Sequence, residues 1–420
     1  MRRWLRVLAR PGHGQRLIAV GLCASASAAV AEEPAPQVQF EGIALRSAAR
    51  LHYLNGALEL HPKAALGFGW DSNVALAADD PVSDSFTIFA VGLETRWHRS
   101  RSDRFVGDLL FKLRDYHQED DSDLYGGQAD LRYTHERAGG RIDVAGAYGR
   151  WDDPLPETGR AQRHQYFNGS LRGRLLGKRD EFGLELFARR DAYLEAGFSD
   201  AAGERDHIDY GVRSRWDHRF ARLRPAALEL VVRHRLYDEA DAPYQDGWVG
   251  TLGAEYRWPL GENTGIELSA GLTGRFHEDD YAGQDGYYDQ TMIGPNVEVA
   301  WAWRDEPVGH LGVALFSRLG DSDTANAARI SALRVDLGRD LNRRWAIAAK
   351  AGLSHRRDSG APVGRKERTT TTLALGARMA FRLRRGFDAR LGAEWRDHDS
   401  EYDADTYERV LLRMSAVVAF

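Results

Sequence analysis

The side chains with the clearest chemistry are arginines that alternate with apolar residues along most of the chain. Arginine presents a planar guanidinium group that binds a carboxylate or a phosphate through two parallel hydrogen bonds. If these residues lie on β-strands, the arginines would share one face of a sheet. They could then bind an anionic ligand, or they could pair with acidic residues on neighbouring strands. The arginines predicted to share this face, and to line a path for a substrate, are Arg114, Arg132, Arg172, Arg213, Arg215, Arg233, Arg235, Arg257, Arg275, Arg334, Arg378 and Arg390. Acidic residues predicted on the same face are Asp108, Asp130, Asp209, Glu229, Glu255, Glu267, Glu298, Asp336, Asp388 and Glu394.

The sequence offers little for catalysis or for metal binding. Ser354 and His355 lack a third group at a spacing that would complete a nucleophile and its base. The chain contains neither G-x-S-x-G nor H-E-x-x-H. The stretch "FHEDDY" at residues 276–281 has oxygen ligands of the kind that calcium takes, but an acidic surface loop is the better explanation. We therefore predict that the protein is not an enzyme and has no cofactor and no metal site.

The elements that would position the arginines are long β-strands. The last fourteen residues, "YERVLLRMSAVVAF", place apolar side chains at every second position, which indicates a strand. Similar segments recur about eighteen times between Leu58 and Phe420, with sixteen to eighteen fitting the pattern, and each could cross a membrane at a tilt. A mean hydropathy of −0.50 agrees with this, because only half of each barrel strand faces lipid. The sequence predicts an all-β, antiparallel, up-and-down transmembrane barrel over residues 58–420.

The connections between these segments fall into two groups. Short basic connections such as "SRSDR" and "RLRRG" alternate with longer acidic ones such as "QEDDSD" and "DEADAPYQD". Outer-membrane barrels have short periplasmic turns and longer extracellular loops, so the acidic loops are predicted to lie outside the cell. Aromatic residues gather near the strand ends, as in the girdles at membrane interfaces. The tryptophans assigned to these girdles are Trp70, Trp97, Trp151, Trp216, Trp248, Trp258, Trp345 and Trp395.

The front of the chain has the features of an export signal. A basic start, "MRRWLRVLAR", precedes a short apolar run that ends in small residues, and Ala29-Val30-Ala31 fits a cleavage site. Residues 1–31 are therefore predicted to be a signal peptide for export through the inner membrane, and the mature protein is predicted to reach the cell outer membrane. Residues 32–57 are predicted to form a periplasmic lead-in or an additional edge hairpin. The one cysteine, Cys23, lies in the predicted signal, which excludes disulfides and thiolate chemistry from the mature protein.

A first strand that ends in "GWDSNVAL" carries a family resemblance. The stretch "LHPKAALGFGWDSNVAL", and "YGRWDDPLP" further along, resemble the β-barrel porin-2 family, which includes outer-membrane proteins of exopolysaccharide biosynthesis operons. Asp71, Ser72 and Asn73 form the family-like motif, and their short polar side chains suit a strand-to-loop turn. The motif also looks like barrels of surface-lipoprotein assembly modifiers, but the 34-residue helical repeats of that family are missing from this sequence. The resemblance implies export of a secreted polysaccharide and brings no catalytic residue with it.

The sequence thus leads to two expected functions. The first is an outer-membrane channel for export of a secreted exopolysaccharide, and the alternative is a substrate-selective or general diffusion porin for small solutes. Phe420 would serve as the signal that the barrel-assembly machinery reads. Other expected partners are outer-membrane lipid and lipopolysaccharide, a polysaccharide that the arginines would favour as an anion, and periplasmic export proteins. No nucleic acid is expected, because the net charge is −5 and no basic domain is present.

Overall fold

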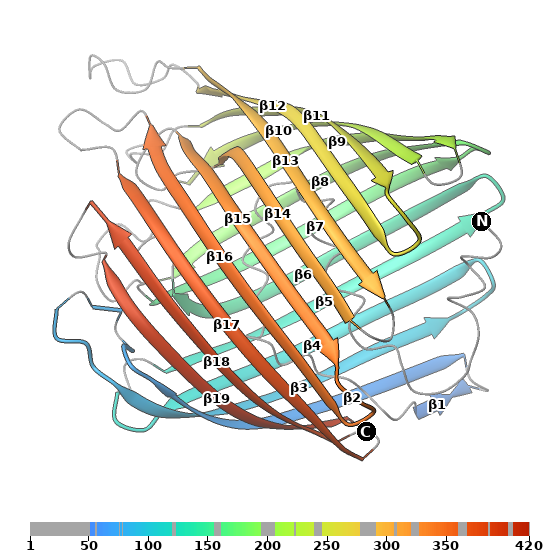
Figure 1. Cartoon of the computed structure of the whole chain (residues 1–420). Helices are drawn as coiled ribbons and strands as arrows, with labels where there is room; N and C mark the ends of the chain where they lie inside the picture. Colours follow the sequence, from blue (N-terminus) through green and yellow to red (C-terminus); the bar gives the residue numbers. More distant parts are fainter. Residues whose placement is uncertain are drawn as a thin grey trace.

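In the structure, a computed structural model, the described residues form one antiparallel sheet of nineteen strands (Figure 1). It describes residues 51–54, 57–74, 76–77, 79–119, 123–154, 161–194, 206–221, 224–238, 246–277, 291–305, 309–320, 327–359, 368–384, 387–401 and 406–419. The predicted signal peptide at residues 1–31 and the final Phe420 lie outside the described residues. In the described part of the chain, no helix is long and apolar enough to cross a bilayer.

Eighteen of the strands, β2 to β19, close into a barrel. Each pairs with the next along the chain, and β19 pairs with β2 to complete the ring, where Figure 1 shows the blue strand beside the dark red one. The predicted all-β antiparallel barrel of about eighteen strands is confirmed. The strands are β2 (Leu58–Asp71), β3 (Asp84–His98), β4 (Asp103–Tyr116), β5 (Leu124–Arg137), β6 (Gly140–Pro154), β7 (Ala161–Leu176), β8 (Asp180–Leu194), β9 (His207–Ala221), β10 (Arg224–Tyr237), β11 (Gly247–Pro259), β12 (Thr264–His277), β13 (Met292–Asp305), β14 (Gly309–Gly320), β15 (Ala327–Asp340), β16 (Trp345–Ser359), β17 (Thr369–Arg384), β18 (Phe387–Ser400) and β19 (Tyr407–Ala419).

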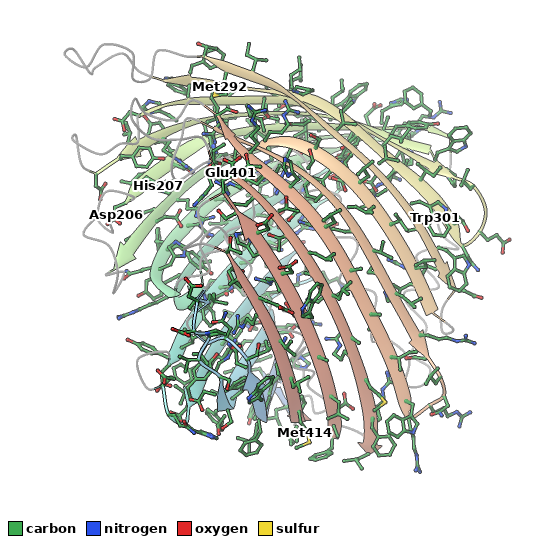
Figure 2. The ribbon with its side chains drawn as sticks, turned by 60° about the vertical axis from the view of Figure 1, so that its left-hand side comes forward. Asp206, His207, Met292, Trp301, Glu401 and Met414 are labelled. Atoms are coloured by element: carbon green, nitrogen blue, oxygen red, sulfur yellow. The ribbon has the colours of Figure 1, made fainter. Side chains whose placement is uncertain are left out.

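Successive side chains along each strand point to opposite faces of the wall, because the side-chain period of a strand is two residues. The outer face is apolar and open to its surroundings: Leu131 is 70% exposed and Phe167 is 61% exposed. Met414, labelled in Figure 2, is 56% exposed on the same face. The alternate residues face the interior, and many of them are charged. An apolar exterior around a polar interior is the arrangement of a transmembrane barrel.

Connection lengths differ between the two ends of the barrel. At the end where β2 starts, the connections range from two residues (138–139) to four (99–102). At the opposite end they range from six residues (155–160) to fourteen (278–291). His207 and Glu401, both labelled in Figure 2, mark this long-loop end. The division into short and long connections therefore follows the prediction, whereas the assignment of each end to one side of the membrane stays a prediction.

A short strand, β1 (Leu51–Tyr53), lies beside the start of β2. It pairs with Leu58–Leu60, whereas β19 pairs with β2 only from Lys63 onward. β1 therefore covers the part of the β2 edge that the end of β19 leaves open. Of the two alternatives for residues 32–57, this pairing corresponds to an edge hairpin for the last few residues, and the limits of the segment stay a prediction.

Candidate functional site

The interior of the barrel is the candidate site, since all twelve arginines predicted for a path lie on the inward face of their strands. On β10, for example, Leu228, Leu230 and Val232 are exposed on the outer face, so Arg233 and Arg235 point inward. The same alternation places Glu229 and Glu255 inside. Whether the arginines contact a substrate stays a prediction, but the structure shows what else they contact.

Near the middle of the wall, arginines on β9 pair with carboxylates on the strands around them. Arg213 donates to Glu185 at 3.3 Å across the β8–β9 ladder. Arg215 donates to Glu255 at 2.7 Å and to Glu229 at 3.2 Å, although Glu255 lies two strands away on β11. Both carboxylates are only 5% exposed. These charges therefore neutralise each other across several strands, and the pairs join the strands that carry them.

At the long-loop end, each of two buried aspartates lies among arginine or histidine side chains. Asp209 is fully buried and accepts hydrogen bonds from Arg233 at 2.8 Å and from Arg235 at 2.7 Å. Asp191, which is 2% exposed, pairs with Arg189 at 2.5 Å and with His164 at 2.6 Å. A buried carboxylate without hydrogen-bond partners would be costly, so these contacts stabilise the two aspartates inside the wall.

The other predicted arginines differ in their surroundings. Arg257 pairs with Glu267 at 2.8 Å and Arg390 with Asp388 at 3.3 Å, whereas Arg334 lies over the Phe316 ring at 4.8 Å. Arg275 is buried at 8% exposure, and Arg378 is exposed on β17. Arg132 and Arg172 form neither a hydrogen bond nor an ion pair within 4 Å with any described residue. Six of the twelve arginines thus form ion pairs with carboxylates, as the ion-pair alternative predicts; these are Arg213, Arg215, Arg233, Arg235, Arg257 and Arg390.

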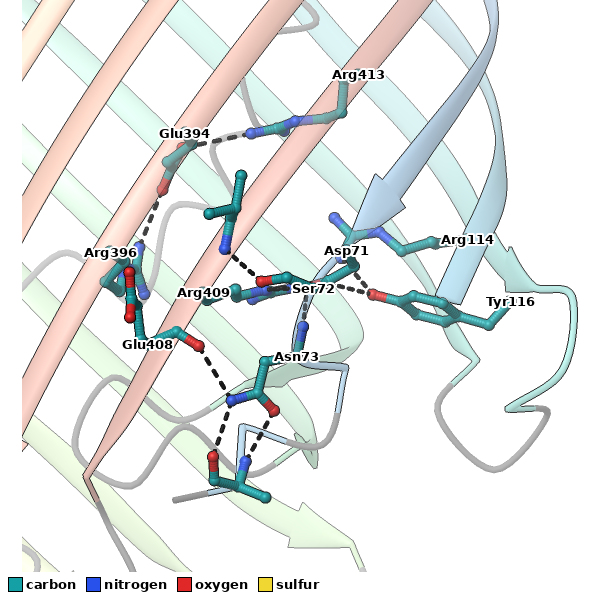
Figure 3. A network of polar contacts seen from close by, with 12 residues as sticks. Asp71, Ser72, Asn73, Arg114, Tyr116, Glu394, Arg396, Glu408, Arg409 and Arg413 are labelled. Carbon is teal, nitrogen blue, oxygen red and sulfur yellow. Dashed lines mark hydrogen bonds and ion pairs between the residues drawn. The ribbon is translucent and has the colours of Figure 1, made fainter. Parts of the chain in front are cut away.

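The family-like motif lies where the first and last barrel strands meet (Figure 3). Asp71 is fully buried and accepts hydrogen bonds from Arg409 Nε at 2.9 Å, from Arg409 Nη2, and from the Tyr116 hydroxyl at 2.9 Å. Arg114 donates to the same hydroxyl at 3.2 Å. We call Asp71, Tyr116 and Arg409 the seam cluster. It joins β2, β4 and β19, so one carboxylate ties together strands from both ends of the chain.

The next two residues of the motif extend the pairing of β2 with β19 beyond the end of β2. Ser72 donates its backbone N–H to the carbonyl of Val410 at 2.9 Å, and its hydroxyl accepts from the Val410 N–H at 2.7 Å. The Asn73 side chain donates to the carbonyl of Glu408 at 3.1 Å and to that of Ala77 at 2.8 Å. The motif is thus a structural turn that also fastens the seam. Arg409, the partner of Asp71, is 338 residues away, and no local pattern in the sequence predicts this pairing.

Two large inward rings, Phe86 and Trp151, lie over glycines of the neighbouring strands. A methyl group in place of the hydrogen of Gly69 would overlap the Phe86 ring, and at Gly126 it would overlap Trp151. Each pair faces across one ladder, so the ring occupies the space that the glycine leaves. Trp151 is 4% exposed on the inner face. Its assignment to an interfacial girdle was therefore wrong, because a tryptophan near a strand end can turn to either face.

The described residues contain no evident catalytic or metal centre. Ser354 faces the interior and His355 faces outward, where its Nδ1 is 3.1 Å from the Thr371 hydroxyl, so the two cannot act on one substrate atom. No group of three His, Cys, Asp or Glu residues in the described part of the chain could hold a metal ion. Of the "FHEDDY" stretch, residues 278–281 lie outside the described residues.

Comparison with known protein families finds no match, and no curated protein matches the sequence. Solved structures of similar form include OccAB4 from Acinetobacter baumannii, with 10% identity, coverage of 89% of this chain and 99% of that chain, and a TM-score of 0.49. The siderophore receptor PiuA from A. baumannii has 9% identity, coverage of 86% and 81%, and a TM-score of 0.48. The siderophore receptor PirA from Pseudomonas aeruginosa has 8% identity, coverage of 86% and 80%, and a TM-score of 0.45. TM-scores below 0.5 do not decide what this barrel carries, and the case for a function rests on its own residues.

Proposed function

We propose that the protein is an outer-membrane channel that exports a secreted polysaccharide. The observation that carries the proposal is the closed ring of eighteen strands with an apolar exterior and a charged interior. Barrels of sixteen to eighteen strands are wide enough to enclose an aqueous channel. The predicted signal peptide at residues 1–31 supports export to the outer membrane, and the resemblance of the Asp71–Asn73 region to the β-barrel porin-2 family supports a polysaccharide cargo.

The charge arrangement favours a hydrophilic cargo that the wall does not hold tightly. Arg215 and Glu255, like Arg213 and Glu185, neutralise each other and leave a polar but largely compensated surface. A channel must bind its cargo weakly enough to release it. The same compensation favours the alternative of a diffusion porin, since a wall with little net charge would pass small solutes without strong selection.

Deletion of the gene in the native host distinguishes polysaccharide export from diffusion of small solutes. With export as the function, polymer should fall at the cell surface and accumulate in the periplasm, and a plasmid copy should restore secretion. In parallel, vesicles that contain the purified barrel are tested for swelling in small sugars. Unchanged secretion together with lost solute uptake would overturn the export proposal in favour of a porin.

A further inference from the structure

One interior carboxylate lacks the ion pairs that the acidic residues on nearby strands form. Glu298 on β13 faces the interior, yet it forms no hydrogen bond and no ion pair within 4 Å with any described residue. By contrast, Glu255 and Glu229 on the nearby strands both pair with Arg215. The oxygens of Glu298 are therefore available to a group that enters the barrel, such as water or cargo.

Glu298 borders a small recess in the inner wall. Ser269 on β12 and Phe316 on β14 are its direct cross-strand neighbours, and all three line the recess together with Gly271, Asn296 and Arg318. The recess has a volume of about 10 Å³, which is room for one water-sized group. Gly271 contributes to this space because it has no side chain.

The groups around the recess match the chemistry of a sugar hydroxyl. A carboxylate accepts a short, charge-assisted hydrogen bond from a hydroxyl, and the Ser269 hydroxyl can donate as well as accept. Ser269 has no hydrogen-bond partner among the described residues. Phe316, 8% exposed, is held by Arg318 at 5.2 Å and Arg334 at 4.8 Å from its ring centroid, and it adds an apolar edge. Asn296 is already engaged, since it donates to Thr273 and accepts from the Leu319 N–H.

We propose that Ser269, Glu298 and Phe316 form a subsite that takes one hydroxyl group of a passing sugar unit. This inference rests on the proposed function and narrows its cargo to hydroxyl-rich polymers, because the groups at the recess suit a hydroxyl that can both donate and accept a hydrogen bond. The entering hydroxyl replaces one water molecule, so binding is weak and each unit is released as the next one arrives.

The test is block of ion current by sugar through the purified full-length barrel in a planar bilayer, with maltohexaose as the neutral probe. The wild type should show a concentration-dependent block. Glu298→Ala should raise the half-blocking concentration about tenfold, the loss expected for one hydrogen bond to a charged group. Ser269→Ala should raise it about threefold, and Glu298→Gln, which keeps an acceptor, should lie between wild type and Glu298→Ala.

Asp108 supplies the matched control. It also faces the interior without a hydrogen bond or ion pair among the described residues, but it lies on β4, nine strands round the barrel from β13. Asp108→Ala should leave the sugar block unchanged. An equal rise of the half-blocking concentration in both variants, or no rise in Glu298→Ala, would overturn the subsite. Conductance without sugar checks that each variant folds. A conducting wild type that sugar does not block would remove the subsite and leave the channel, whereas a barrel that carries no current would remove both.

Discussion

The seam cluster gives the sharpest prediction about stability. Replacing Asp71 by Asn removes the charge that compensates Arg409, which is 9% exposed, and leaves a guanidinium inside the wall without its carboxylate. Removal of one partner from a buried ion pair typically costs about 3–5 kcal/mol, because the remaining charge stays desolvated. The Tyr116 hydroxyl also loses a charged acceptor. We expect Asp71→Asn to lower the free energy of unfolding by an amount in this range.

The measurement is unfolding in urea of the barrel reconstituted in lipid vesicles, followed by the mobility shift of folded barrel on unheated gels. Glu267→Gln is the control, since it breaks a pair of similar length in which the Arg257 side chain is 47% exposed. An exposed pair contributes about 0–1 kcal/mol, so this variant should unfold close to the wild type. The double variant Asp71→Asn with Arg409→Met should recover part of the loss, because the uncompensated charge is gone. Equal stability of Asp71→Asn and Glu267→Gln would refute the reasoning.

Three further predictions concern topology, assembly and selectivity. A cysteine at Glu239 should react with an impermeant reagent on intact cells and one at Asn342 only after the outer membrane is opened; the reverse pattern would place the long loops inside. Deletion of Phe420 should lower the amount of heat-modifiable barrel in the outer membrane, and normal levels would make this residue incidental to assembly. Arg172→Gln should make the channel more selective for cations, measured as a shift in reversal potential. It should not lower the stability, because this arginine has no ion pair among the described residues. Arg233→Gln, which leaves the fully buried Asp209 with one arginine fewer, should instead lower the unfolding midpoint, and equal midpoints for the two variants would contradict the assignment of their roles.

The strand pattern could be predicted from the sequence, because side-chain period and connection length are local properties. The alternation in "YERVLLRMSAVVAF" indicated which residues share a face, and β19 follows it. The partners of each side chain depend instead on register and on barrel closure, which join distant segments. Thus the pairing of Asp71 with Arg409, and the choice of Arg172 rather than Arg213 as the arginine without a carboxylate, could not be read from spacing.

The glycines beneath the inward rings also bear on how the bore of the barrel is set. Because Phe86 and Trp151 occupy the space above Gly69 and Gly126, each ring lies closer to the backbone than it could over a residue with a side chain. A larger residue at either glycine would meet not only the ring but also a backbone carbonyl, that of Leu412 near Gly69 and that of Arg150 near Gly126. Substitution of either glycine would therefore displace the inward ring and the neighbouring strand together, so the bore at that height and the strand pairing would change together.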